Sequence, residues 1–566
     1  MRPFLSAVAA LLSILVLACG RSHVTGAPTF ALAVAPGQLR LLPGLDQAVT
    51  LTLQPEPGFS GVVELSAGEL GPGLLAQITP TRLTLADGAS AQATLVLTAA
   101  EEAPAGTRRI GLRAAAPDSE QSAELVVDIP VAAFFTVMTY RSSDPSNFAY
   151  LVYQDGDGAW TAVRGTGGLY RLPVTDPAGR FGVLLGDVCR SDSASTWITN
   201  GFFSTLGEVQ LLQALVLCNP QPGPPPLTFD LSGAFAGATG RSVLIGANSG
   251  LWSFPVGTTE YALKLLKGSG DLVAATYPDT RTYLPARFIL ERGRDTQSST
   301  TRDFDFAGQG ADAPPALAIQ RPDLSPGESF QGTVQYQTSR GQVAILGYGQ
   351  DLAAYAPVPP ALTLPGDAWV YAFYALGANQ SRMIQGSGNE PPGSLAPHLP
   401  PAIPPYDLTT TGGRAPRLSL AWSAVTPAPN VHEVVLLQQV LNRQSYCYLY
   451  FGKSWHGGAP RLSWTLPDLT AVPGFLPEFF PQSGTTVQVS LYQSGTQTGQ
   501  APPGFAMGTA LEAPFRLVTP AGAPGFPGDR SEAPGMRLRP QGTATPAATA
   551  PWIEYWAASR TQTLVP

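Results

Sequence analysis

The stretch that decides the fold class is Leu83-Thr-Leu-Ala-Asp-Gly-Ala-Ser-Ala-Gln-Ala-Thr-Leu-Val-Leu-Thr98. Ala91, Ala93, Leu95 and Leu97 occupy every second position, and in an extended chain alternate side chains point to the same face. The spacing therefore predicts a β-strand that buries one face.

The same alternation runs outward from this stretch, from Phe30 to Val131. Gly and Pro interrupt it at roughly ten-residue intervals, which is typical of short strands joined by turns. Further examples are Val49, Leu51 and Leu53, and the set Ala123, Leu125, Val127 and Ile129. About seven such strands in about 100 residues predict a β-sandwich built from two sheets.

Four stretches, GFSGVVELS (58–66), LGPGLLAQITP (70–80), residues 83–98 and AGTRRIGLRA (105–114), resemble the immunoglobulin-like modules of bacterial surface and secreted proteins. The resemblance covers residues 29–131. This region has neither Cys nor Trp, so the core of antibody domains is absent. The resemblance implies spacing or adhesion more often than catalysis.

The chain begins with MRPFLSAVAALLSILVLACG. Arg2 precedes an apolar run that is too short to span a bilayer, and the small residue Ala18 precedes Cys19, so we expect residues 1–18 to be a cleaved export signal. The segment Val16-Leu-Ala-Cys19 resembles the lipobox of bacterial lipoproteins. That resemblance implies a lipid on Cys19, with residues 19–28 as a tether. The alternative is a soluble secreted protein in which Cys19 carries no lipid.

The lipoprotein resemblance also implies a location. The protein would be anchored in the bacterial cell envelope without spanning the membrane. Gly20 follows Cys19, as in lipoproteins exported to the outer membrane of Gram-negative cells. In other bacteria the anchor would lie in the outer face of the cytoplasmic membrane.

Composition limits the partners. Charged residues make up 13% of 566 residues, with 60 Gly and 56 Pro, which indicates several folded domains rich in turns. The formal net charge is −7, and no stripe of Lys or Arg interrupts the chain, so nucleic acid is excluded as a partner.

Residues beyond 131 keep the strand-like alternation, and we expect an all-β, multidomain protein. The templates Gly168-Leu-Tyr-Arg-Leu-Pro-Val174 and Gly250-Leu-Trp-Ser-Phe-Pro-Val256 predict two related β modules, 132–220 and 225–312. A β-rich region, 316–515, follows; within it Val431–Leu441 fits a helix or a strand equally. Residues 516–566 are rich in Pro and Gly, and we expect an extended segment that Trp552, Tyr555 and Trp556 could pin.

Three cysteines remain after Cys19. Cys189 and Cys218 each end an apolar run, and in an oxidising compartment we expect them to form a disulfide; the alternative is two buried free thiols. Cys447 alternates with Tyr446 and Tyr448 along a strand-like segment, so it lies on the opposite face and is expected to be a buried, inert thiol.

The sequence contains no catalytic motif that we recognise. Its four histidines lack the spacing of metal ligands, and we expect no metal and no cofactor. The acidic segment Asp155-Gly-Asp-Gly158 has the composition of a hairpin turn, and Tyr150–Tyr153 and Trp160–Val163 are the strands that it would join.

The most suggestive cluster is Tyr446, Tyr448, Tyr450 and Trp455. These aromatic residues could form a face on which a ligand stacks, or they could pack across strands inside a sandwich. We favour a membrane-anchored extracytoplasmic lipoprotein with a non-catalytic structural, adhesion or polymer-binding role, whose partner is an envelope polysaccharide or another surface protein. The alternative is an envelope glycan hydrolase with β-sandwich accessory modules.

Overall fold

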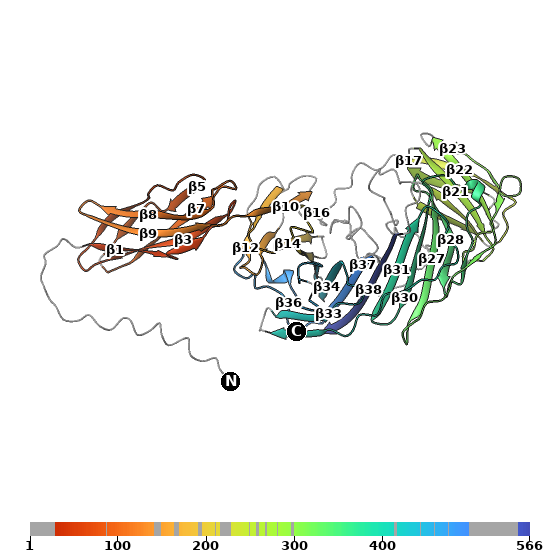
Figure 1. Ribbon diagram of the computed structural model, residues 1–566. Helices are drawn as coiled ribbons and strands as arrows, with labels where there is room; N and C mark the ends of the chain where they lie inside the picture. Colours follow the sequence, from red (N-terminus) through yellow and green to blue (C-terminus); the bar gives the residue numbers. More distant parts are fainter. Residues whose placement is uncertain are drawn as a thin grey trace. The chain divides into compact units, whose positions relative to one another are not determined.

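The computed structural model describes residues 29–86, 88–140, 149–163, 169–190, 195–209, 211–215, 228–240, 242–247, 250–255, 258, 260–266, 269–279, 281–295, 299–411, 416–441, 443–457, 459–473, 475–496 and 553–565. The chain divides into two compact units, Met1–Ala132 and Ala133–Pro566 (Figure 1). The division lies next to residue 131, where the sequence analysis ends the first module.

The N-terminal unit is an immunoglobulin-like β-sandwich, as predicted. Its sheets have the orders β1-β3-β7-β5 and β2-β9-β8-β4-β6. The strands are β1 (Phe30–Ala35), β2 (Gln38–Arg40), β3 (Asp46–Pro55), β4 (Gly61–Ala67), β5 (Leu74–Thr79), β6 (Arg82–Leu85), β7 (Ala91–Ala99), β8 (Gly106–Ala116) and β9 (Ser119–Ile129). The first two strands enter opposite sheets, and β2 pairs with β9 in parallel, as the split first strand of immunoglobulin domains does.

The core of this unit follows the predicted alternation. In β7, Ala93, Leu95 and Leu97 are buried, whereas the residues between them are more exposed. Leu125 and Val127 of β9 meet them from the other sheet in the same hydrophobic cluster. Complete burial of each such side chain contributes about 1.5–3 kcal/mol, so the alternation accounts for the sandwich.

The C-terminal unit repeats one strand order four times. In each repeat the first strand pairs with the fourth, the second pairs with the third and fifth, and the fifth pairs with the sixth, all antiparallel. A further strand or bridge runs parallel to the first strand in repeats 1 to 3. Each repeat therefore folds the same way.

Repeat 1 consists of β10 (Ala133–Tyr140), β11 (Tyr150–Asp155), β12 (Thr161–Ala162), β13 (Leu169–Val174), β14 (Arg180–Arg190), β15 (Ser195–Thr205) and β16 (Leu211–Leu215). Repeat 2 consists of β17 (Thr228–Ala236), β18 (Ser242–Ala247), β19 (Gly250–Pro255), β20 (Glu260–Leu266), β21 (Ser269–Tyr277), β22 (Arg287–Asp295), β23 (Thr300–Thr301) and β24 (Phe304–Asp305); β25 (Ala311–Asp312) pairs with its β22.

Repeat 3 consists of β26 (Leu317–Ala318), β27 (Ser329–Gln337), β28 (Val343–Gln350), β29 (Ala354–Tyr355), the 3-10 helix η1 (Pro360–Leu362), β30 (Ala368–Leu376) and β31 (Gln380–Gly388). Repeat 4 consists of β33 (Arg417–Ser423), β34 (Val431–Val440), β35 (Arg443–Gly452), β36 (Arg461–Thr465), the 3-10 helix η2 (Pro477–Phe479), β37 (Val487–Thr496) and β38 (Ile553–Leu564); β32 (Asp407–Thr411) pairs with its β33.

Segments 132–220 and 225–312 therefore share a strand order, but the two sequence templates do not mark equivalent positions. Gly168–Val174 contains β13, the fourth strand of repeat 1, whereas Gly250–Val256 contains β19, the third strand of repeat 2. The two modules are therefore related by the way their strands pair and not by the similarity of the two seven-residue templates.

Three of the repeats join into one twelve-stranded sheet with the order β12-β11-β14-β15-β35-β34-β37-β38-β31-β30-β27-β28 (Figure 1). The sixth strand of repeat 1, β15, pairs in parallel with the third strand of repeat 4, β35, and the sixth strands of repeats 4 and 3 pair antiparallel. The boundaries expected at residues 220, 316 and 516 therefore do not interrupt this sheet.

Two sequence expectations concern strands of repeat 4. Val431–Leu441, left open between helix and strand, contributes β34, which pairs with strands on both sides. The extended segment expected over 516–566 ends in β38, in the middle of the sheet, where Trp556 is buried. The rest of that expectation falls on residues outside those described.

The hydrophobic cores also pair the repeats. Leu184 and Phe203 of repeat 1 share a core with Trp422, Leu449 and Phe451 of repeat 4. Repeats 2 and 3 share another core in the same way. Among the described residues, no helix is long and apolar enough to cross a membrane.

Candidate ligand-binding cleft

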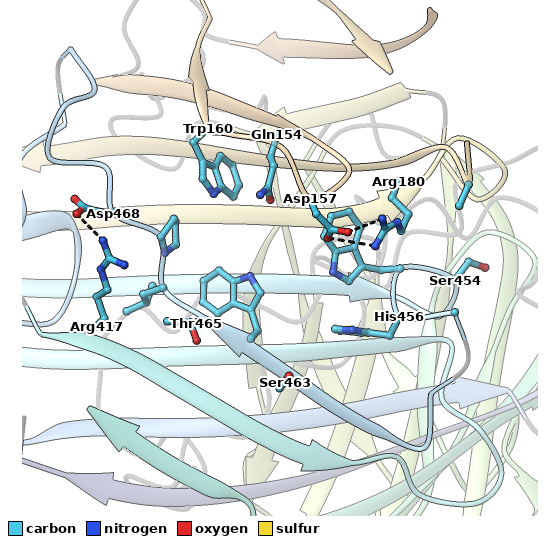
Figure 2. Close-up of a pocket in the computed structure, with 16 residues that line it drawn as sticks. Gln154, Asp157, Trp160, Arg180, Arg417, Ser454, His456, Ser463, Thr465 and Asp468 are labelled. Atoms are coloured by element: carbon cyan, nitrogen blue, oxygen red, sulfur yellow. Dashed lines mark hydrogen bonds and ion pairs between the residues drawn. The ribbon is translucent and has the colours of Figure 1, made fainter. Parts of the chain in front are cut away.

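An open cleft of about 740 Å³ lies where repeats 1 and 4 meet (Figure 2). Repeat 1 contributes the end of β11, turn residues and the start of β14, and repeat 4 contributes the start of β33, β36 and the turns beside β36. The lining residues are Gln154, Asp157, Trp160, Ala178, Arg180, Arg417, Ser454, Trp455, His456, Gly457, Ser463, Trp464, Thr465, Leu466, Pro467 and Asp468.

The hairpin predicted around residues 155–158 forms one wall. Strands β11 and β12 pair antiparallel, as expected. Asp155 accepts hydrogen bonds from the backbone N–H groups of Thr175 (2.9 Å) and Asp176 (3.0 Å), which ties this turn to the next one. The turn places Gln154, Asp157 and Trp160 in the lining.

Three tryptophans gather around one buried phenylalanine. The ring centroids of Trp160, Trp455 and Trp464 lie 6.1, 5.4 and 5.3 Å from that of Phe203, in edge-on arrangements. Trp160 belongs to repeat 1 and the other two belong to repeat 4. Phe203 is fully buried and Trp455 is 8% exposed, whereas Trp160 and Trp464 are half-buried, so these two present more of their rings to the cleft.

Arg180 connects the two sides of the cleft. Its guanidinium donates to Asp157 (2.7 Å) and to Asp176 (3.0 Å), and its central carbon lies 5.9 Å from the centre of the Trp455 ring. These hydrogen bonds raise the pKa of Arg180 above its usual value. At the other end of the cleft, Arg417 donates to Asp468 over 2.5 Å (Figure 2).

Asp468 and His456 of the lining have lowered pKa values. Hydrogen bonds from Thr470, together with Arg417, lower the pKa of Asp468 to about 2. Burial, assisted by the charge of Arg180, lowers the pKa of His456 to about 4, so this imidazole is neutral at neutral pH. Within the described residues, its Nε2 is buried without a hydrogen-bond partner.

A second hollow of about 100 Å³ adjoins the cleft. Both spaces share Arg417, Leu466, Pro467 and Asp468, and the second hollow adds Phe475 and Phe480 among other residues. The two hollows thus lie next to the same four residues of repeat 4.

The predicted aromatic face does not form as one surface, and the assignment of Trp455 to it is wrong. Tyr446 and Tyr448 stack on β35, with centroids 6.0 Å apart and parallel rings, and Tyr450 is buried against Phe202 of the neighbouring strand. Because β35 ends at Gly452, the following turn carries Trp455 to the opposite side of the sheet, against Phe203.

Tyr450 therefore shows cross-strand packing, which was the alternative to a ligand face, whereas Tyr446 and Tyr448 stack on each other along one strand. Cys447 is a buried free thiol that shares the hydrophobic core with Leu449, as predicted. Burial raises the pKa of its thiol.

Other predicted sites lie outside the described residues. Cys19 and Cys218 belong to segments that the structure does not describe, and for Cys189 it describes only the backbone, which pairs with Thr196. The lipid and the disulfide therefore remain predictions. Over the residues that are described, no group of three or more His, Cys, Asp or Glu side chains could hold a metal ion.

Sequence reasoning missed Trp160, Arg180 and Trp464 as site residues. Trp160 does adjoin the turn that was recognised, but no local pattern joins it to Arg180 or to Trp464 in repeat 4. Their common feature is a tertiary position around Phe203.

Comparison with known proteins gives no family. No family model matches the chain, and no curated protein matches it. Solved structures with a likeness include the Bacillus anthracis TIE protein (10% identity, 66% of this chain and 75% of that chain, TM-score 0.15) and surface layer protein SbsC domains 4–9 (10% identity, 82% and 80%, TM-score 0.15). Titin domains A168–A170 give 10% identity, 62% and 93%, and a TM-score of 0.15.

TM-scores this low carry no argument about this chain. Its class rests on its own strand pairing: a multidomain all-β protein with an immunoglobulin-like sandwich and a four-repeat unit that contains an open cleft.

Proposed function

We propose that this protein is a membrane-anchored extracytoplasmic lipoprotein that binds a polysaccharide of the envelope or its surroundings without cleaving it. The observation that carries this proposal is the gathering of Trp160, Trp455 and Trp464 around Phe203 in an open cleft.

The chemistry of the lining suits a sugar ring. A pyranose has faces of C–H groups and a rim of hydroxyl groups, so it needs flat apolar surfaces beside hydrogen-bonding groups. Indole rings supply the first and keep a polar N–H. Gln154, Ser463 and Thr465 supply the hydrogen-bonding groups. Figure 2 shows Gln154 on one side of the cleft and Ser463 and Thr465 on the other.

The shape of the lining favours a polymer over a single sugar. The cleft is open and has a volume of about 740 Å³. A chain of several sugar rings could therefore enter it without its ends being enclosed.

The carboxylates of the lining favour binding over hydrolysis. A glycosidase needs a carboxylic acid that keeps its proton near neutral pH, which requires a raised pKa. The two acids of the lining, Asp157 and Asp468, are each paired with an arginine, and the pKa of Asp468 is lowered. The alternative of an envelope glycan hydrolase therefore has less support.

The anchor is supported by the sequence. The export signal and Cys19 would attach the protein to a membrane of the bacterial envelope through two or more acyl chains, which is enough for stable anchoring. The immunoglobulin-like unit would then act as a spacer between the lipid and the repeats.

The test is binding of the detergent-solubilised full chain to a panel of soluble polysaccharides, with release of reducing ends as the measure of hydrolysis. We expect binding without hydrolysis, and Trp160→Ala should weaken it about tenfold, since one aromatic stacking contact contributes about 1.5 kcal/mol. Trp252→Ala, in the edge strand β19, is the matched control, and Tyr448→Ala tests the other sheet face. Binding that depends on Tyr448 and not on Trp160, or any turnover, would overturn the proposal.

A further inference from the structure

The arginines and acids of the cleft neutralise one another. Arg180 and Arg417 contribute two positive charges to the lining, and Asp157 and Asp468 contribute two negative charges, so the sum is zero. Each arginine is hydrogen-bonded to one of these acids. The lining therefore offers a ligand no charge that is not already paired.

The surroundings of Arg180 make it less available still. Besides Asp157 it binds Asp176, through Nη2 at 3.0 Å and Nε at 3.3 Å, and its side chain is 28% exposed. A ligand carboxylate or sulfate would have to displace one of these partners and leave an acid without its counter-charge, which costs free energy.

We infer that the cleft selects an uncharged glycan and discriminates against polyanionic ones. This inference rests on the proposed function, and it names the chemical class of the polysaccharide. Stacking on the tryptophans and hydrogen bonds to Gln154, Ser463 and Thr465 need no charge on the ligand.

The structure also offers a way to reverse the selectivity. The Arg417 side chain is 48% exposed, and its carboxylate partner is Asp468. In Asp468→Asn the amide oxygen can still accept the hydrogen bonds that Thr470 donates to the carboxylate, while the negative charge is lost. This variant therefore leaves Arg417 with an uncompensated positive charge in the cleft.

A matched control lies on the same small sheet. Arg461 and Asp407 form an exposed ion pair on β36 and β32, and neither residue lines the cleft. Asp407→Asn removes the negative partner of Arg461 in the same manner, but outside the cleft.

The experiment measures affinity of the full chain for neutral and anionic forms of one backbone: hydroxyethyl and carboxymethyl cellulose, and pullulan and carboxymethyl pullulan. We expect the neutral form to bind at least about tenfold more tightly, and its affinity to be unchanged by added salt, because screening acts on charged partners. Asp468→Asn should raise affinity for the anionic form about tenfold in low salt, and Asp407→Asn should not.

The outcomes separate the two proposals. Equal or tighter binding of the anionic forms, still dependent on Trp160, overturns the selectivity and leaves the proposed function standing. No gain with Asp468→Asn, or the same gain with Asp407→Asn, also overturns the selectivity. If no polysaccharide of either kind binds, both proposals fall.

Discussion

Phe203 and Phe451 face each other on neighbouring parallel strands, and their rings stack with centroids 4.6 Å apart and planes 13° apart. Phe203 is the last residue of β15 in repeat 1 that pairs with β35 of repeat 4, and Phe451 is its partner. The strand pair that joins repeats 1 and 4 into one sheet therefore also contacts the tryptophans of the candidate cleft, through Phe203.

We predict that Phe203→Ala destabilises the C-terminal unit by about 3–5 kcal/mol, the usual cost of removing a fully buried phenylalanine ring. Urea unfolding followed by tryptophan fluorescence measures it, because all nine tryptophans lie beyond residue 132. Phe254→Ala, in the edge strand β19 of repeat 2, is the control and should cost less, since Phe254 is only partly buried. Equal losses would contradict the central role of Phe203.

The buried ion pair of Arg382 and Glu328 in repeat 3 makes a second prediction. The side chain of Glu328 is fully buried, and that of Arg382 is 8% exposed. Glu328→Gln should cost about 3–5 kcal/mol, because it leaves the guanidinium charge in the interior without its partner. If the unfolding free energy stayed within about 1 kcal/mol of the wild type, the pair would be dispensable.

The same pair predicts a pH dependence. Burial opposes ionisation of Glu328, but hydrogen bonds from Arg382 and from the Ser325 backbone outweigh it, so the pKa is lowered. Stability from this carboxylate is then complete above its unfolded pKa of about 4.3 and is lost as the pH falls through its folded pKa. Urea midpoints between pH 7 and pH 3 should fall less steeply in Glu328→Gln than in the wild type.

Glu433 should act in the opposite direction. Burial raises the pKa of this carboxyl to about 7, although a hydrogen bond with Tyr450 partly offsets the effect. The folded state therefore holds the proton more tightly, and stability declines as the pH rises from about 4.3 to about 7. Glu433→Gln should remove this decline and add about 4 kcal/mol at pH 8, since one pKa unit corresponds to about 1.4 kcal/mol. The control is Glu260→Gln at an exposed position, for which we expect the unfolding free energy to stay the same. A wild-type stability that does not vary with pH in this window would refute the prediction.

The lipid on Cys19 is tested by metabolic labelling with a fatty acid analogue. Wild type and the Cys447→Ser control should label strongly, and Cys19→Ser should not, because the acyl chains need Cys19, the first residue after the cleaved leader. Equal weak labelling of all three would mean that the chain is secreted or retained by another route.

Thiol counting tests the disulfide between Cys189 and Cys218. The denatured, unreduced protein should show one free thiol, Cys447, which the structure describes as free and buried. A bridge of this span would contribute about 3–4 kcal/mol through the lost freedom of the unfolded chain. Three free thiols would show that no bridge exists.

The sequence was sufficient wherever the deciding feature is local. Alternation with a period of two placed Ala93, Leu95 and Leu97 on the buried face of β7 and Cys447 on the face opposite Tyr446 and Tyr448. The Gly and Asp residues of 155–158 sufficed for the hairpin, because a tight turn depends on the φ angles that its own residues tolerate.

Local pattern was not sufficient for Val431–Val440 or Ile553–Leu564. In both strands four consecutive side chains, 431–434 and 556–559, are buried, so both faces are covered there and the alternation that would identify a strand is weakened. For Ile553–Leu564, the Pro- and Gly-rich composition of the preceding residues favoured an extended segment over a strand of the sheet.

The four repeats, their joining and the cleft were decided by tertiary structure alone. Backbone hydrogen bonds between strand edges are nearly independent of side chains, so nothing in residues 195–205 specifies that they pair with 443–452. Trp160, Arg180 and Trp464 acquire their common surroundings only after that pairing forms. The sequence by itself determined the strands in which apolar and polar residues alternate and the faces that those strands bury; the edges that meet, and hence the site, follow from packing across the whole C-terminal unit.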